Sequence, residues 1–188
     1  LKDRNFKAVV IGGSAGSFPV VSELLSELPS TFNLPIIMGL HRLKHVRSGF
    51  AEALQIKSKI PVKEPSDKEK IKKGVAYVAP ANYHLQVELG LTFALSTDEM
   101  VHHSRPSIDV LFESSAFSYG NKLLILILSG ANTDGADGFK YAQNKGAFTV
   151  VQDPKDCKIA TMTNAALDIM KPNCILDTKG IIQLLKQL

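Results

Sequence analysis

A serine in a glycine-rich loop has the surroundings most typical of covalent catalysis in this chain. Residues 12–16 are GGSAG, which matches the pattern G-x-S-x-G with Ser14 at its centre. Glycines on both sides let the backbone turn tightly, and the N-terminus of a following helix offers free N–H groups to a developing oxyanion. A serine hydroxyl is a weak nucleophile that needs a nearby base. The same loop also fits a simple turn or a phosphate cradle, so the motif alone leaves three interpretations open.

Two further side chains follow apolar segments in the way that Ser14 does. His41 ends the apolar run at residues 34–40, and Asp134 follows the run at residues 122–128. An imidazole can take the serine proton, and a carboxylate can hold that imidazole in the correct tautomer. We therefore predict a Ser-His-Asp triad in which the Ser14 hydroxyl reaches the His41 ring directly or after a small rotation.

Other histidines and carboxylates compete for these roles. His45 is expected at the surface, and His84 fits a buried structural histidine with both ring nitrogens bonded. His102 and His103 lie in a polar loop, and adjacent histidines in an extended strand face opposite ways, so we expect no metal site there. An aspartate followed by glycine before a helix, as at Asp134, also fits a helix cap. Its competitors as the third catalytic residue are Asp98, Asp137 and Asp153.

Three other classes of protein fit the residues less well. A dinucleotide fingerprint needs G-x-G-x-x-G, whereas position 14 is serine and no acidic residue ends the second apolar run. No Walker lysine follows the glycines, which disfavours a nucleotide-binding domain. An α/β-hydrolase orders its triad serine, aspartate, histidine, with the nucleophile well into the chain. Here the serine follows the first apolar run and the histidine follows the second.

Length and composition exclude several further classes. The 188 residues suffice for one core, so we expect a single domain over residues 1–188. The net charge of +4 is small and spread along the chain, so we expect no nucleic-acid partner. Cys157 and Cys174 have no metal-ligand spacing around them, and reduced thiols favour a cytoplasmic protein. Since no apolar run reaches transmembrane length, we expect no membrane insertion.

Strand-like and helix-like segments alternate along most of the chain. Strands are expected at residues 7–11, 34–40, 62–64, 74–79, 122–128, 148–152 and 174–176, with a hairpin at 84–89 and 91–96. Helices are expected at residues 18–28, 47–56, 108–119, 137–145, 163–170 and 179–187. This alternation predicts an α/β fold, a doubly wound, mainly parallel sheet with helices on both faces and a small antiparallel hairpin. Ligands of such sheets bind at the carboxyl ends of the strands.

Taken together, these segments resemble the catalytic domain of the chemotaxis protein-glutamate methylesterase family. The matching pieces follow the family's order over nearly the whole chain. They are VIGGSAG at 10–16, LH at 40–41, VAPANYHL at 78–85, RPSIDVLF at 105–112, LSGANTDGA at 128–136 and QD at 152–153. Each piece is modest alone, but their combination in a chain of this length is specific.

The resemblance implies a catalytic role for three residues, Ser14, His41 and Asp134. It implies a hydrolase that removes methyl esters from glutamates on the cytoplasmic helices of methyl-accepting chemotaxis receptors and that deamidates receptor glutamines. Both reactions would pass through a glutamyl-serine ester. We expect oxyanion donors near Ala15 and Ala131, and we expect Arg105 either to orient an acidic receptor segment or to anchor the helix that follows it. No cofactor and no metal is expected.

Three positions depart from the family pattern. Ser17 stands where a second glycine is usual, Ala131 where methionine is common, and Thr163 where proline is frequent. The changes at Ser17 and Ala131 keep a second hypothesis open, a catalytically weak or inactive methylesterase-fold module that docks signalling partners. No receiver domain is expected within residues 1–188. We therefore expect either that the chain lacks the control that a receiver domain exerts, or that control comes through another arrangement, such as a fused regulatory domain or a fused methyltransferase.

Overall fold

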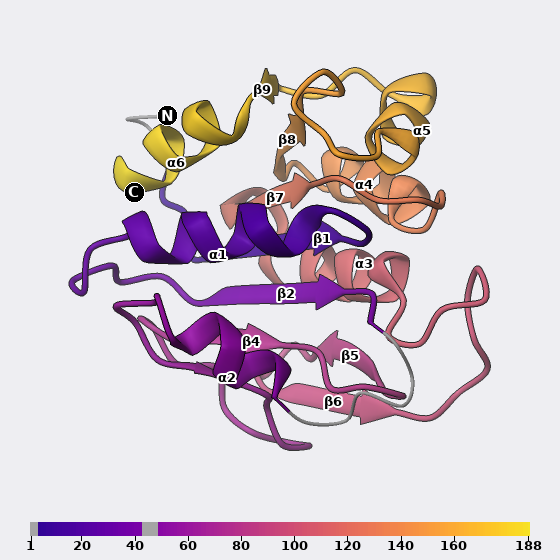
Figure 1. Cartoon of the computed structure of the whole chain (residues 1–188). Helices are drawn as coiled ribbons and strands as arrows, with labels where there is room; N and C mark the ends of the chain where they lie inside the picture. The colour runs from indigo at the N-terminus through magenta and orange to yellow at the C-terminus, as the bar shows by residue number, and fades with distance from the viewer. Residues whose placement is uncertain (1–3, 43–48) are drawn as a thin grey trace.

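The computed structural model describes residues 4–42 and 49–188. In this part of the chain one parallel sheet has the strand order β3-β4-β2-β1-β7-β8-β9 (Figure 1). Its strands are β1 Ala8–Gly13, β2 Ile36–Leu40, β3 Val62–Lys63, β4 Ala76–Val78, β7 Leu123–Ile127, β8 Phe148–Gln152 and β9 Cys174–Leu176. A separate antiparallel pair is formed by β5 His84–Val87 and β6 Phe93–Ser96.

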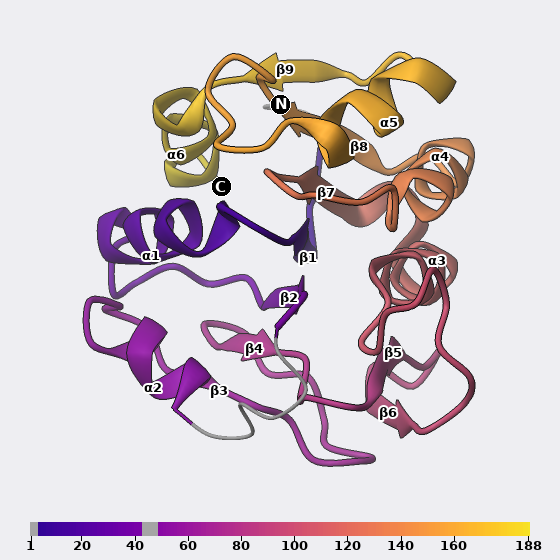
Figure 2. The same ribbon diagram turned by 45° about the vertical axis from the view of Figure 1, so that its right-hand side comes forward.

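Helices cover both faces of the sheet, as Figures 1 and 2 show. One face carries α1 Ser17–Glu27, α2 Phe50–Gln55 and α6 Thr178–Lys186. The other face carries α3 Ile108–Tyr119, α4 Ala136–Asn144 and α5 Thr161–Ile169, together with the β5–β6 hairpin. A 3-10 turn, η1 Gly120–Lys122, joins α3 to β7. The predicted doubly wound α/β fold with a small hairpin is confirmed.

The two central strands explain why the sequence shows unbroken apolar runs. Every residue of β1 and of β7 is buried, because helices cover both of their faces. Val9 and Ile11 belong to the core beneath α1 and α6, whereas Val10 belongs to the core beneath α3 and α4. A strand buried on both sides therefore loses the polar alternation of a half-exposed strand.

The predicted elements lie where expected, with ends that differ mostly by one or two residues. The hairpin strands are shorter than predicted because a tight turn intervenes, in which the Glu88 N–H donates to the Thr92 carbonyl. The predicted helix at 47–56 is seen as α2 from Phe50 onward, and residues 47–48 lie outside the described residues. His45 also lies outside them. Among the described residues, no helix combines the length and the hydropathy that crossing a membrane requires.

Candidate active site

The candidate residues gather at the carboxyl edge of the central strands. The chain leaves β1 toward β2 on one side, and it leaves β7 toward β8 on the other. The strand order therefore reverses between β1 and β7, and ligands of doubly wound sheets bind in the crevice at such a reversal. Ser14 follows β1, His41 follows β2, and Asp134 lies in the loop between β7 and α4 (Figure 1).

Backbone hydrogen bonds fix the loop that carries Ser14. The Ser14 N–H donates to the Ser129 carbonyl at 2.9 Å, and the His41 N–H donates to the Gly13 carbonyl at 3.0 Å. Gly13 pairs with Leu40 in the ladder, so Ser14 and His41 follow paired residues on strands that lie about 4.8 Å apart. Gly16 caps α1 with a φ of 88°, a left-handed conformation that glycine adopts without strain.

The Ser14 hydroxyl makes no hydrogen bond to any residue within 4–42 or 49–188. Ser14 is partly exposed. Catalytic hydrogen bonds are often formed only once substrate binds, and a serine changes its χ1 rotamer readily. The expected contact between this hydroxyl and the His41 ring therefore stays a prediction.

His41 and Asp134 form a direct side-chain pair. The imidazole Nε2 of His41 lies 2.7 Å from Oδ2 of Asp134, and the His41 side chain is 13% exposed. An ionised carboxylate accepts the proton of Nε2, which leaves the lone pair of Nδ1 to act as the base. The two ring nitrogens therefore exchange the roles that they have in the chymotrypsin triad, where Nδ1 faces the aspartate and Nε2 acts as the base. In this structure the Asn132 amide donates to that lone pair, with Nδ2 of Asn132 3.4 Å from Nδ1 of His41.

Asp134 is anchored by the N-terminus of α3. Its Oδ1 accepts from the Ser107 hydroxyl at 2.9 Å and from the Asp109 N–H at 3.1 Å. Its Oδ2 accepts from the Ile108 N–H at 2.7 Å as well as from His41. Burial raises the pKa of this carboxyl, but the hydrogen bonds from His41, Ile108 and Asp109 outweigh it, so the pKa of Asp134 is lowered. Asp134 therefore caps α3 rather than the helix that directly follows it.

The two residues suggested for the oxyanion hole are more exposed than His41 and Asp134. Ala15 and Ala131 are both exposed, and their N–H groups have no acceptor within the described residues. Oγ of Ser129 lies 2.8 Å from the Ala15 carbonyl oxygen, and the Ser129 N–H donates to Oε1 of Gln152 at 2.9 Å. The first bond holds the nucleophile loop against the end of β7, and the second ties that end to β8. Free amide donors at Ala15 and Ala131 are what an oxyanion hole requires.

Ser17, where the family pattern first breaks, stabilises the turn behind the nucleophile. Its hydroxyl donates to the Ser14 carbonyl at 2.7 Å, and its N–H donates to the same oxygen at 3.0 Å. Ser17 is buried, with 2% of its surface exposed. The side chain therefore points back into the loop and supports it, rather than lining the face that meets a substrate.

Arg105 is bound to the loop that follows β6. Its Nη1 donates to the Thr97 carbonyl at 2.6 Å and to the Asp98 carbonyl at 2.9 Å. The residue also lines a hollow of about 370 Å³ beside Glu64 and Tyr83. These bonds match the anchoring alternative, while a role for Arg105 toward an acidic receptor segment stays a prediction.

Two residues outside the predicted triad support Asp134, and one of them, His84, is the buried structural histidine that the sequence predicts. Ser107 caps α3 and also donates to Asp134, and a serine directly before an apolar helical segment is a recognisable capping signal. His84 is buried, accepts from the Ser107 N–H at 3.2 Å through Nδ1, and lies 2.9 Å from the Glu99 carbonyl through Nε2. His84 thus positions the cap. Nothing in the local sequence shows either long-range contact.

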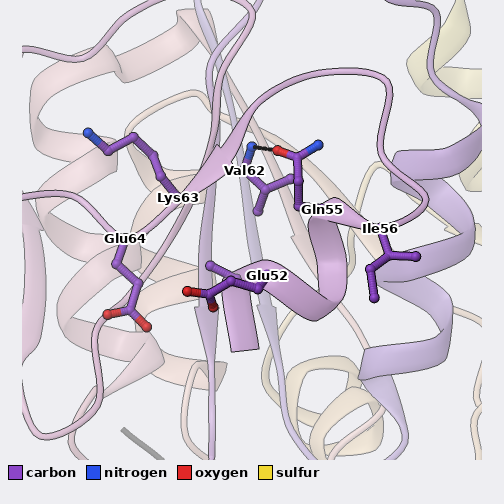
Figure 3. Close-up of a pocket in the computed structure, with 7 residues that line it drawn as sticks. Glu52, Gln55, Ile56, Val62, Lys63 and Glu64 are labelled. Carbon is purple, nitrogen blue, oxygen red and sulfur yellow. Dashed lines mark hydrogen bonds between the residues drawn. The ribbon is translucent and has the colours of Figure 1, made fainter. Parts of the chain in front are cut away.

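Figure 3 shows a further hollow, which shares Glu64 with the hollow beside Arg105. It measures about 440 Å³ between α2 and β3, and the Val62 N–H donates to Oε1 of Gln55 beside it at 2.7 Å. None of the three predicted catalytic residues is among those lining it, which are Ala51, Glu52, Gln55, Ile56, Val62, Lys63 and Glu64. The shape of this hollow therefore adds nothing to the chemistry at the strand ends.

A doubly wound sheet with a serine, a histidine and a buried aspartate after its three central strands is the arrangement expected of a serine hydrolase. Residues 9–185 match the family model described as CheB methylesterase, and the chain belongs to this family.

Individual relatives agree with this assignment. A putative protein-glutamate methylesterase/protein-glutamine glutaminase of Leptospira interrogans is 41% identical over 180 residues, covering 96% of this chain and 93% of the relative. A protein-glutamate methylesterase/protein-glutamine glutaminase 1 of Saccharophagus degradans is 36% identical over 85% of this chain, which spans 44% of that relative. The crystal structure of the Thermotoga maritima CheB methylesterase catalytic domain superposes with a TM-score of 0.91 at 27% identity, covering 97% of this chain and 98% of that one.

Proposed function

We propose that this chain hydrolyses glutamate methyl esters on chemotaxis receptors in the cytoplasm and deamidates receptor glutamines. The CheB family match and the names of the relatives support the reaction class. The observation that carries the mechanism is the 2.7 Å contact between His41 and Asp134. These residues follow β2 and β7, the two neighbours of β1, and the Ser14 loop follows β1 between them. A buried, ionised carboxylate on an imidazole serves to activate a neighbouring hydroxyl.

The acylation step follows from this geometry. The Ser14 hydroxyl oxygen attacks the ester carbonyl carbon while Nδ1 of His41 takes the hydroxyl proton. The developing oxyanion is held by the free N–H groups at Ala15 and Ala131, and such donors are typically worth about 3–4 kcal/mol each. The carbon–methoxide bond then breaks, and the imidazolium returns its proton to the methoxide. Methanol leaves, and a glutamyl-serine ester remains.

Deacylation repeats the same proton transfers with water. Nδ1 of His41 removes a proton from water, which attacks the glutamyl-serine carbonyl, and the imidazolium then protonates Oγ of Ser14 as the ester bond breaks. The product is a glutamate carboxylate and a regenerated serine. With a glutamine substrate the first leaving group is ammonia, and all later steps are unchanged. Throughout, Asp134 stabilises the imidazolium, because its lowered pKa keeps it ionised.

Replacing the nucleophile tests this function. We expect Ser14→Ala to lower methanol release from methylated receptor fragments by about 10⁴-fold or more. Ser26→Ala is the matched control, because the Ser26 hydroxyl bonds only a carbonyl within α1. Full activity in Ser14→Ala would overturn the assignment of the nucleophile. A wild-type chain that binds receptor fragments but releases neither methanol nor ammonia would instead support the docking module.

A further inference from the structure

Three side chains outside the triad place ligand atoms close together. One atom each from His102, Asp109 and Asp137 lies within 4.8 Å of the other two. They come from three different elements: the turn before α3, the first turn of α3 and the first turn of α4. His102 and His103 lie in a turn rather than a strand, and His102 meets carboxylates from other elements instead of its neighbour. The sequence-based expectation of no metal site treated the two histidines as a pair.

Asp109 holds a buried oxygen without a hydrogen-bond donor. The residue is 5% exposed, and its Oδ1 accepts from the Gly138 N–H at 2.7 Å. Its Oδ2 is buried and has no hydrogen-bond partner within the described residues. A buried carboxylate oxygen that lacks a donor is unfavourable, and such groups are normally paired or coordinate a metal. This oxygen points toward His102.

The spacing of these atoms suits coordination of a metal ion. Nε2 of His102 lies 3.3 Å from Oδ2 of Asp109, without the geometry of a hydrogen bond. Two ligands on a tetrahedral Zn²⁺ with bonds of about 2.0–2.1 Å are themselves about 3.3 Å apart. An imidazole nitrogen with two carboxylate oxygens is a ligand set that suits Zn²⁺ and its first-row neighbours.

The cluster is also accessible and negatively charged. The His102 side chain is 43% exposed, and Asp137 is exposed, so an ion has a path of entry and room for water ligands. Within the described residues, no lysine or arginine forms an ion pair with Asp109, Glu113 or Asp137. Apart from His102, which carries a charge only when it is protonated, no basic side chain in the described part of the chain pairs with these carboxylates.

We propose that His102, Asp109 and Asp137 form a binding site for a divalent transition-metal ion such as Zn²⁺. The ion links the first turns of α3 and α4 and leaves coordination positions open to water. It takes no part in ester hydrolysis as derived above. Its ligands are distinct from Ser14, His41 and Asp134, although the Asp109 N–H also donates to Asp134.

Titration calorimetry of the whole chain with Zn²⁺ tests this site. We expect saturable one-to-one binding that His102→Ala and Asp137→Asn each weaken by at least about tenfold, the lower end of what losing even an outer-shell partner costs. Both side chains are exposed, so the fold should survive, which circular dichroism verifies. His103→Ala is the matched control and should bind like the wild type. The thermal midpoint should rise with Zn²⁺ in the wild type and in His103→Ala, but not in the double variant His102→Ala/Asp137→Asn.

Three outcomes overturn the site. The first is an absence of saturable binding to the wild type. The second is equal weakening by His102→Ala and His103→Ala, which indicates nonspecific histidine binding. The third is binding that survives His102→Ala but disappears in His41→Ala, which places the ion at the triad.

Discussion

Two carboxyl groups at the N-terminus of α3 share their burial, but their pKa values are shifted in opposite directions. Asp134 accepts hydrogen bonds from the Ser107 hydroxyl, two backbone N–H groups and His41, and its pKa is lowered. Asp109 accepts one from Gly138 on Oδ1, while Oδ2 has no donor within the described residues. Burial, together with the negative charge of Asp134, raises the pKa of Asp109 to about 6.

The difference shows that donors, rather than depth, decide in which direction the pKa of a buried carboxyl is shifted. Desolvation opposes ionisation at both positions, and only Asp134 has enough hydrogen bonds to reverse it. The fully satisfied carboxylate can hold an imidazolium during catalysis. Asp109, whose Oδ2 lacks a donor, is unfavourable as a buried carboxylate, and a bound cation would stabilise its charge.

Removing the charge of the satisfied carboxylate should have the largest effect. We expect Asp134→Asn to lower kcat for methanol release by about 10⁴-fold, or about 5.5 kcal/mol, because an amide favours the wrong His41 tautomer. Activity is measured per folded molecule, with the fraction folded taken from urea denaturation at the assay temperature. Asp168→Asn, an exposed change on α5, should leave kcat within about twofold. A comparable loss in both variants would mean that Asp134 has no special role.

Removing the charge of Asp109 should change how the unfolding free energy depends on pH. The pKa of Asp109 is raised from its usual 3.8 to about 6, so between these values the folded state binds more protons than the unfolded state. The unfolding free energy contributed by this group therefore falls as the pH rises through that window. We therefore expect the unfolding free energy of Asp109→Asn, relative to that of wild type, to rise by on the order of 1–3 kcal/mol as the pH goes from about 4 to about 7. Urea denaturation across this range, with a chelator present, measures the gain.

The opposite sign is expected of Asp134, whose lowered pKa stabilises the fold above its unfolded pKa and loses this effect as the pH falls. Parallel pH profiles for Asp109→Asn and wild type would contradict the contrast between the two carboxylates.

The smallest effect is expected where one donor to Asp134 is removed. Ser107→Ala eliminates the hydroxyl that donates to Asp134 and accepts from the Val110 N–H as the cap of α3. We expect the unfolding free energy to fall by about 1 kcal/mol, as for other helix caps. Urea denaturation of Ser26→Ala provides the control, which should stay within about 0.5 kcal/mol of wild type. An equal change in the two variants would show that Ser107 contributes no more than an ordinary surface serine.

Periodicity predicted the elements well because their burial repeats locally. The segment at 108–119 was predicted with the bounds of α3, and the apolar run at 122–128 contains β7. The shorter hairpin strands were less well predicted, because a turn within the hairpin ends them. Position after a strand also singled out Ser14, His41 and Asp134. Alternation of strands and helices places such residues at one edge of a parallel sheet.

The contacts that shape the site could not be read from local sequence. Asp134 is followed by a glycine and a helix, which fits a cap of α4, yet it caps α3, which begins 26 residues earlier. His102 stands beside His103 in the chain, yet its nearest carboxylate is Asp109 on α3. Both outcomes depend on how α3 and α4 pack together on one face of the sheet.

The sequence by itself determined the order of strands and helices, the burial of β1 and β7, and the loop that exposes Ser14, because each follows from the chemistry of neighbouring residues. Only the tertiary structure decided which nitrogen of His41 meets Asp134, and why the pKa of one buried carboxyl is lowered while that of the other is raised. Those properties depend on donors brought from distant segments, since the pKa of a buried group is set by every partner within a few ångströms.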